Sequence, residues 1–245
     1  MNFCKKTALI TGASVGIGRA VAHGMAGRGA KLILLDNNFE KLKRVKEELK
    51  IHTENVLIYD CDVSNEQRVR EVVADAAAKH GTIDILVNNA AIWRLSTPFL
   101  ETPMEKWKAL LDVNVMGTIY VTHAVLPYMI AQKYGRIINV ASVAGIYGNR
   151  RMVPYSATKG AVISFTKALA KEMAPHGITV NATSPGTVSP ADNEDIDFSE
   201  PNDMSYMQRT GTDRENADLI CFLASEGAAY ISGQNIQIDG CRKSI

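Results

Sequence analysis

A tyrosine and a lysine four residues apart, Tyr155 and Lys159, lie in the stretch NRRMVPYSATK at 149–159. Dehydrogenation of an alcohol needs a base for the hydroxyl proton, and reduction of a ketone needs the same group as an acid. Free tyrosine, with a pKa of about 10, is a weak base at neutral pH, but a nearby cation lowers that pKa. If a helix begins near Tyr155, Lys159 lies one turn further along the same face. The spacing therefore predicts an acid/base pair, and an ordinary surface pair on a helix is the alternative.

Ser142 is the third residue of this candidate site. It ends the apolar stretch GRIINVAS at 135–142, which has the pattern of a buried strand. Doubly wound α/β folds bind ligands beyond the carboxyl ends of their strands. The hydroxyl of Ser142 is therefore placed to hold a substrate oxygen beside Tyr155.

Short apolar runs alternate along the chain with longer amphipathic segments, which predicts strands that are connected by helices. Nearly continuous apolar strands suit a parallel sheet that is covered on both faces. We predict one α/β domain over residues 1–245, with a doubly wound parallel sheet of seven strands. The predicted strands are 7–11, 31–35, 55–59, 83–88, 135–142, 178–184 and 234–239, and the predicted helices include 40–50, 66–79, 103–132 and 157–173.

The segment 185–206 interrupts this alternation. It contains three prolines and six Asp or Glu residues and has no strong helix or strand pattern. Long irregular loops inside compact domains are usually functional or mobile. We predict a mobile lid that closes over bound ligands.

A glycine-rich turn, TGASVGIGRA at 11–20, follows the first predicted strand. Its glycines allow a tight turn and a close approach of the backbone to a pyrophosphate, and the next helix directs its positive end at the phosphates. A tight turn without a ligand would need similar glycines. The residues that we assign to a dinucleotide here are Gly12, Ser14, Gly16, Ile17 and Gly18.

Asp36 ends the second predicted strand, about 20 residues after the glycines. A carboxylate at this place accepts hydrogen bonds from the adenosine ribose and would repel a 2′-phosphate. The neighbours Val15 and Asn37 carry no compensating positive charge. Asp36 therefore predicts NAD as the cofactor, and it is also able to cap the following helix.

The spacing of the glycines resembles the TGxxxGxG turn of the short-chain dehydrogenase/reductase family and differs from GxGxxG. The resemblance covers nearly the whole chain, and it implies a Rossmann-type sheet of seven strands and hydride transfer between a nicotinamide dinucleotide and an alcohol or carbonyl. The matching residues are Thr11, Gly12, Gly16, Gly18, Asp62, Val63, Asn88, Asn89, Ala90, Asn114, Ser142, Tyr155, Lys159, Pro185 and Gly186.

The resemblance also implies individual roles. Tyr155 would be the acid/base, Ser142 would orient the substrate oxygen, and Lys159 would lower the tyrosine pKa and hold the nicotinamide ribose. Asn114 would anchor a water in the proton relay. The further cofactor positions implied are Asp62 and Val63 at the adenine, Asn88 and Ala90 near the ribose and nicotinamide, and Pro185, Gly186 and Val188 near the carboxamide.

Three residues depart from the family pattern. Ala91 stands where glycine usually follows NNA, and Pro190 stands where a threonine often binds the carboxamide. Because proline lacks a hydroxyl and an N–H, the backbone of Val188 must take over that contact, with Thr187 or Ser189 as further candidates. Cys241 replaces the last glycine of the usual DGG, and it has no evident chemical role.

The substrate pocket is expected to be lined by loops that contain several arginines. Arginine binds carboxylates bidentately, and the stretches NAAIWR and NRRMVPY resemble the sugar-acid branch of the family. We predict an NAD-dependent dehydrogenase for a polar hydroxy compound, with a sugar acid favoured. The predicted substrate residues are Arg94, Asn149 and Arg150, together with Ser142 and Tyr155.

Other interpretations stay open. The arginines, including Arg151, would alternatively face solvent or pair with the acidic segment 185–206. A 3-oxoacyl-thioester reductase is the alternative enzymatic interpretation. A dinucleotide-binding protein without turnover is the non-catalytic interpretation.

Composition limits the partners. The formal charge of +1 gives no field for nucleic acid or an anionic membrane, and four widely spaced cysteines suggest neither a metal site nor disulfides. No apolar run approaches the roughly 18 residues of a membrane span. We expect a cytoplasmic enzyme with a small-molecule substrate, and the resemblance implies a homotetramer assembled through the helices 103–132 and 155–173.

Overall fold

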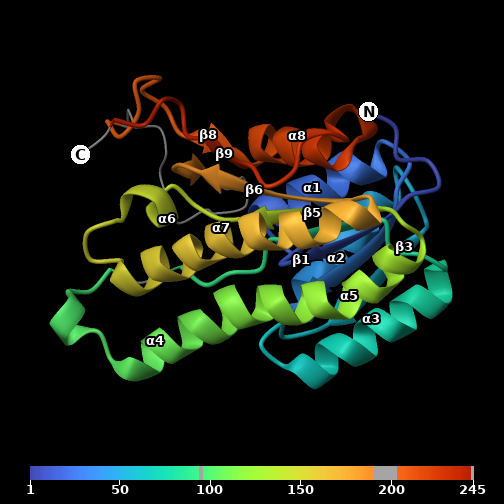
Figure 1. Cartoon of the computed structure of the whole chain (residues 1–245), viewed down its shortest axis with the longest axis horizontal. Helices are drawn as coiled ribbons and strands as arrows, with labels where there is room; N and C mark the ends of the chain where they lie inside the picture. Colours follow the sequence, from blue (N-terminus) through green and yellow to red (C-terminus); the bar gives the residue numbers. More distant parts are fainter. Residues whose placement is uncertain (94–95, 190–202, 244–245) are drawn as a thin grey trace.

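The computed structural model describes residues 1–93, 96–189 and 203–243. Seven parallel strands form one sheet in the order β3-β2-β1-β4-β5-β6-β9, and the order reverses between β1 and β4 (Figure 1). This arrangement confirms the predicted fold class. The strands are β1 (Thr7–Thr11), β2 (Lys31–Asp36), β3 (Val56–Asp60), β4 (Ile85–Asn88), β5 (Gly135–Val140), β6 (Ile178–Pro185) and β9 (Asn235–Ile238).

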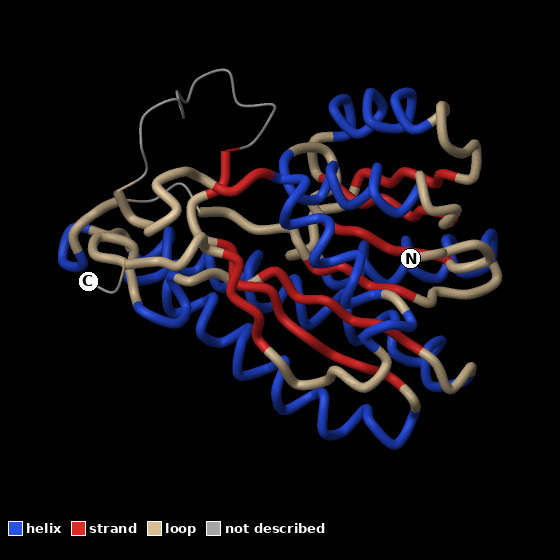
Figure 2. Tube along the Cα trace, turned by 90° about the horizontal axis from the view of Figure 1, so that it is seen from above, coloured by secondary structure: helices blue, strands red, loops and turns tan. Residues whose placement is uncertain are grey.

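Helices cover both faces of the sheet (Figure 2). One apolar cluster packs α1, α2 and α8 on one face, and a second cluster packs α3, α5 and α7 on the other. The strands between these layers are apolar throughout because both of their faces are buried. The helices are α1 (Gly16–Ala26), α2 (Phe39–Leu49), α3 (Glu66–His80), α4 (Met104–Leu111), α5 (Thr118–Ala131), α6 (Ala144–Tyr147), α7 (Val153–Met173) and α8 (Asp213–Ala224).

The predicted helix 103–132 is divided by a π-helical turn, Asp112–Gly117, between α4 and α5. Single π-helical turns inside helices are frequent at functional sites. The whole stretch Met104–Ala131 is long and apolar enough to cross a membrane, since one 18-residue window has a mean hydropathy of 1.4. This finding corrects the expectation that no apolar run approaches the length of a membrane span, because polar residues scattered through the window obscured it in the sequence. By length and composition alone this is weak evidence, and Val121, Val125 and Met129 are buried in the core.

A second, two-stranded sheet lies at the predicted lid. It pairs β7 (Val188–Ser189) with β8 (Gly211–Thr212) and so joins the two ends of the segment that follows β6. Residues 190–202 of the predicted lid lie outside the described residues.

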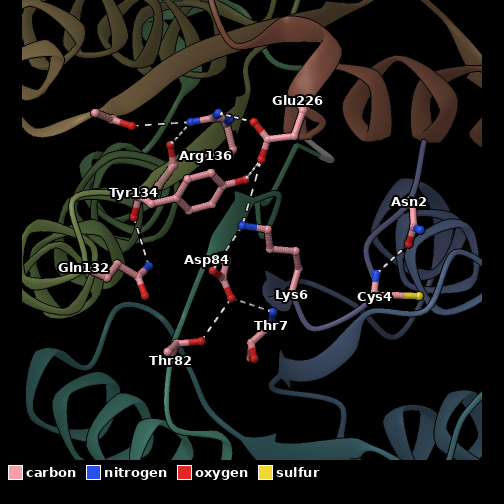
Figure 3. A network of polar contacts seen from close by, with 12 residues as sticks. Asn2, Cys4, Lys6, Thr7, Thr82, Asp84, Gln132, Tyr134, Arg136 and Glu226 are labelled. Atoms are coloured by element: carbon pink, nitrogen blue, oxygen red, sulfur yellow. Dashed lines mark hydrogen bonds and ion pairs between the residues drawn. The ribbon is translucent and has the colours of Figure 1, made fainter.

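A network of ionic and aromatic contacts holds the amino ends of the strands together (Figure 3). Lys6 Nζ lies 3.7 Å from Asp84 Oδ1 and 3.4 Å from the centre of the Tyr134 ring. The guanidinium of the buried Arg136 donates to Glu226 Oε2 at 3.2 Å, and the Tyr134 hydroxyl donates to Glu226 Oε1 at 2.9 Å. This network lies at the opposite edge from the carboxyl ends of the strands, so its role is structural.

Candidate functional site

A cavity of about 860 Å³ opens at the carboxyl ends of the strands, where the strand order reverses. It is bounded by the glycine turn, by the segments that follow β4, β5 and β6, and by the start of α7. Most of the residues predicted from the sequence line it. These are Gly12, Ser14, Gly16, Ile17, Asp36, Asp62, Val63, Ala90, Ser142, Asn149, Tyr155, Lys159, Pro185, Gly186 and Val188.

The helix α7 positions the tyrosine and the lysine. It begins at Val153, four residues earlier than predicted, and Pro154 occupies a first-turn position, where its missing N–H costs nothing. Tyr155 is therefore in the first turn and Lys159 in the second, and both line the cavity together with Ser142. The structure thus brings Ser142, Tyr155 and Lys159 to one cavity, as the sequence predicts.

The buried Lys159 is anchored to the neighbouring strand. Its Nζ donates a hydrogen bond of 2.7 Å to the carbonyl oxygen of Val140 and lies 5.8 Å from the centre of the Tyr155 ring. Burial lowers the pKa of Lys159 to about 8. The ammonium is thus ready to lose its charge in the mildly alkaline range.

The pKa of Tyr155 is raised, which corrects the expectation that Lys159 lowers it. Burial of the phenol raises this pKa, and the hydrogen bond with Ser142 opposes the shift without cancelling it. At neutral pH the Lys159 ammonium favours the phenolate too weakly to offset this burial. Tyr155 is therefore protonated at neutral pH, which is the state of a proton donor.

The depressed pKa makes Lys159 a source of instability at neutral pH. Between pH 8 and pH 10.5 the unfolded chain binds more protons than the folded one, so the contribution of Lys159 to the free energy of unfolding rises with pH there and is lowest below pH 8. The shift corresponds to about 3 kcal/mol, and loss of the bond to Val140 would offset about 1 kcal/mol.

We therefore expect Lys159→Met to raise the free energy of unfolding by about 2 kcal/mol at pH 7 while it reduces activity. The gain should shrink as pH approaches 10. Urea denaturation at the two pH values measures this, with Lys167→Met on the exposed side of the same helix as the control. A destabilised Lys159→Met protein at pH 7 would contradict the account.

The backbone of the glycine turn at 11–20 allows a ligand and the following helix to approach it closely. Gly12 and Gly16 have φ values of +63° and +55°, in the left-handed region that favours glycine. A Cβ on Gly18 would lie 2.2 Å from the carbonyl oxygen of Gly12, so Gly18 allows the helix to pack on the turn and does not line the cavity. The residue before α1, Val15, provides no side-chain cap, and the helix start borders the cavity.

Asp36 lies at the far end of the cavity, at the end of β2. Its Oδ2 accepts a hydrogen bond from the Ser14 backbone N–H at 2.9 Å, and its Oδ1 accepts one from the Asn38 N–H at 2.8 Å. Each oxygen keeps a lone pair for a further donor. The carboxylate is thus fixed by the backbone and able to accept hydrogen bonds from a ribose.

The structure moves one cofactor assignment from Asn88 to Asn89. The Asn88 side chain is buried and donates to Thr122 Oγ1 and to Asn139 Oδ1, both at 2.9 Å, so it points into the core. Asn89 lines the cavity, and its Nδ2 donates to the carbonyl oxygens of Thr11 and Gly12. The pair Asn88 and Asn89 indicated a cofactor position in the sequence, but the sequence did not reveal which of the two side chains faces the cavity.

Asn114 lies in the π-helical turn behind the cavity and does not line it. Its side chain bridges elements: Nδ2 donates to the Ile92 carbonyl oxygen at 3.0 Å and to Thr158 Oγ1 at 3.1 Å, and Oδ1 accepts from the Ile92 N–H at 2.9 Å. These bonds connect the segment after β4 to α7. A role in a proton relay stays a prediction.

The predicted substrate arginines differ in their placement. Arg94 lies outside the described residues, and Arg150 is exposed and is not among the residues that line the cavity. Arg151 is exposed as well and donates to the Ser96 carbonyl oxygen at 3.3 Å. Among the described residues, the arginine that lines the cavity is Arg242, which lies outside the stretches NAAIWR and NRRMVPY on which the prediction was based.

Two departures from the family pattern have structural consequences. Ala91 lines the cavity and does not have a positive φ, so its backbone needs no glycine. Cys241 does adopt a φ of +59°, which costs about 1 kcal/mol for a residue with a Cβ. Pro190 lies outside the described residues.

Comparisons with known proteins agree with this geometry. The family model for short chain dehydrogenase matches residues 6–200. The 3-oxoacyl-[acyl-carrier-protein] reductase FabG of Thermotoga maritima is 40% identical over 238 residues, 96% of each chain. The 3-oxoacyl-[acyl-carrier-protein] reductase of Synechocystis sp. is 38% identical over 237 residues, again 96% of each.

Solved structures are similar as well. NAD+-bound xylitol dehydrogenase has a TM-score of 0.90 and 32% identity, covering 98% of this chain and 100% of that one. ElxO with NADP bound has a TM-score of 0.90 and 33% identity, with 96% and 97% covered. Fold and cavity thus define an α/β oxidoreductase with a dinucleotide-binding site, acting on CH–OH groups. The chain belongs to the short-chain dehydrogenase/reductase family.

Proposed function

We propose that this protein reduces the 3-oxo group of an acyl thioester, with Tyr155 as the proton donor. The observation that carries the proposal is the geometry of the cavity, in which Tyr155 is hydrogen-bonded to Ser142 and lies beside the buried Lys159. The FabG relatives, at 40% and 38% identity, support a 3-oxoacyl substrate over the polar hydroxy compound favoured by the sequence.

Side chains of the cavity bind the substrate carbonyl oxygen and supply the proton that it receives. The substrate carbonyl oxygen accepts hydrogen bonds from Ser142 and Tyr155, and the proton moves from the Tyr155 hydroxyl to that oxygen as its negative charge develops. Lys159, still charged below pH 8, stabilises the phenolate that remains. A nicotinamide dinucleotide supplies the hydride when it is bound.

The residues present fit such a dinucleotide. The start of α1 at the cavity and the positive-φ glycines suit a pyrophosphate, and the fixed carboxylate of Asp36 suits an adenosine ribose. We propose NADH as the preferred form, because Asp36 would repel a 2′-phosphate. Lys41 is a cation that also lines this end of the cavity, so the preference requires measurement.

A second candidate is the NAD-dependent oxidation of a polar hydroxy compound such as a sugar acid or polyol. Asp36 and the similarity to NAD+-bound xylitol dehydrogenase favour it. The 3-oxoacyl reductase relatives, at 40% and 38% identity, favour the first candidate over it.

A substrate panel separates the two candidates. We expect kcat/KM for acetoacetyl-CoA reduction with NADH to exceed that for oxidation of any sugar acid or polyol with NAD at pH 7. The reverse order would favour the second candidate. Inactivity on both classes, with retained dinucleotide binding, would favour a protein without turnover.

We also propose a homotetramer in the cytoplasm, acting on a small-molecule substrate. Large apolar side chains are exposed on α4 and at the start of α7, including Met104, Leu111 and Val153, which supports burial against other subunits. Light scattering at micromolar concentration should give four times the chain mass of 26.7 kDa. A monomeric mass would refute the assembly.

A further inference from the structure

Arg242 follows the last strand and lines the cavity that holds Tyr155. We infer that Arg242, together with Asn149, forms an anion-binding subsite that recognises a negatively charged group, a carboxylate or a phosphate, on the carbonyl substrate. The inference rests on the proposed function in that the cavity reduces a carbonyl compound.

The backbone around Arg242 is held in place on both sides. Asp239 Oδ1 accepts hydrogen bonds from the N–H groups of Cys241 at 3.1 Å and Arg242 at 3.3 Å, which turns the chain at the end of β9. The Lys243 N–H then donates to the Met204 carbonyl oxygen at 2.9 Å, and Ser205 and Arg242 form an antiparallel bridge. Arg242 is thus part of a paired segment at the cavity and is not a frayed end.

The guanidinium has unused donors. One of its amino groups donates to Asn149 Oδ1 at 3.2 Å, a neutral acceptor. Across residues 1–93, 96–189 and 203–243, no carboxylate forms an ion pair with Arg242, and Asp239 is engaged by the backbone. A guanidinium has five N–H donors in a planar fork that fits carboxylates and phosphates bidentately. Among these residues, none accepts a hydrogen bond from its remaining donors, which face the cavity that Arg242 lines.

The position in the sheet separates this subsite from the cofactor. Asp36 ends β2 and Asp62 follows β3, at one end of the strand order, whereas Arg242 follows β9 at the other end. Its partner Asn149 precedes Tyr155 by six residues and lines the same cavity. An anion held by Arg242 consequently lies on the substrate side of the cavity.

Matched pairs of substrates test the subsite. Acetoacetate and its methyl ester differ by a carboxylate charge, and the acetoacetyl thioesters of phosphopantetheine and pantetheine differ by a phosphate. For at least one pair, we expect Arg242→Gln to lower the ratio of kcat/KM for the charged member to that for the neutral member about tenfold or more. The pair that responds identifies the anion as carboxylate or phosphate. The neighbouring Lys243→Gln, which removes the same charge outside the cavity lining, should leave both ratios unchanged.

Binding without turnover keeps the test separate from the proposed function. Isothermal titration of acetoacetate and CoA into the parent and Arg242→Gln proteins, in the presence of NAD, should show a rise in Kd of about tenfold for one of them. If no substrate is reduced but this rise appears, the proposed function fails and the subsite stands. Unchanged ratios in both pairs, or an equal effect of Lys243→Gln, would overturn the subsite.

Discussion

Tyr155→Phe should lower kcat for carbonyl reduction by about 10²- to 10⁴-fold, the range that loss of a general acid produces. The phenylalanine ring keeps the packing of the half-buried side chain, so the dissociation constant of the dinucleotide should change little. The loss arises because the hydroxyl that hydrogen-bonds Ser142 is the proposed source of the proton. Steady-state kinetics and fluorescence titration of NADH measure the two quantities.

Tyr147→Phe is the matched control for this variant. Tyr147 lies eight residues earlier, is exposed, and donates its hydroxyl to Gln237 Oε1 at 3.1 Å, away from the cavity lining. It should retain nearly the parent rate. A Tyr155→Phe protein that also retains the parent rate would show that the proton comes from elsewhere.

Replacement of Asp36 should have the second large effect, on the choice of cofactor. With Val15→Arg and Asp36→Asn combined, we expect the ratio of kcat/KM for NADPH to that for NADH to rise about 10²-fold or more, because a repulsive charge is exchanged for an attractive one. Val15 is 40% exposed next to the turn, so an arginine fits there without displacing the core. Kinetics with both cofactors at one substrate concentration measure the ratio.

Asp60→Asn is the control for the cofactor variant. Asp60 pairs in register with Asp36 on the adjacent strand, but it is exposed and does not line the cavity. Its replacement should leave the ratio within about threefold of the parent. A parent enzyme that already prefers NADPH would contradict the assignment of Asp36.

The catalytic residues could be predicted because two regular periodicities place them. Ser142 lies just past a strand whose carboxyl end is shared with the other strands of a parallel sheet. Tyr155 and Lys159 lie one helical turn apart, and this spacing is independent of where the helix begins. The helix in fact begins at Val153, earlier than predicted, without altering the pair.

The direction of a side chain at the end of a strand was harder to predict. Asn88 is the last residue of β4 and points into the core, whereas Asn89 faces the cavity. Successive side chains alternate between the faces of a strand, so an error of one residue reverses the assignment. The burial partners Thr122 and Asn139, which settle the direction, come from other elements.

The position of Arg242 at the cavity could not be predicted from the sequence for a different reason. Its place depends on pairing between the chain end and residues 204–207, which only the folded structure brings together. The pKa of Tyr155 likewise depends on burial, which residue spacing does not give.

Transfer of deuterium from NADH labelled at C4 tests the central claim most directly. Parent enzyme that is supplied with acetoacetyl-CoA and NADH carrying two deuteriums at C4 should form a 3-hydroxy thioester that is one mass unit heavier, with the label at C3. The Tyr155→Phe protein should form it at least about 10²-fold more slowly. Oxidation of NADH without label in the product, or no product at all from the parent enzyme, would contradict the account.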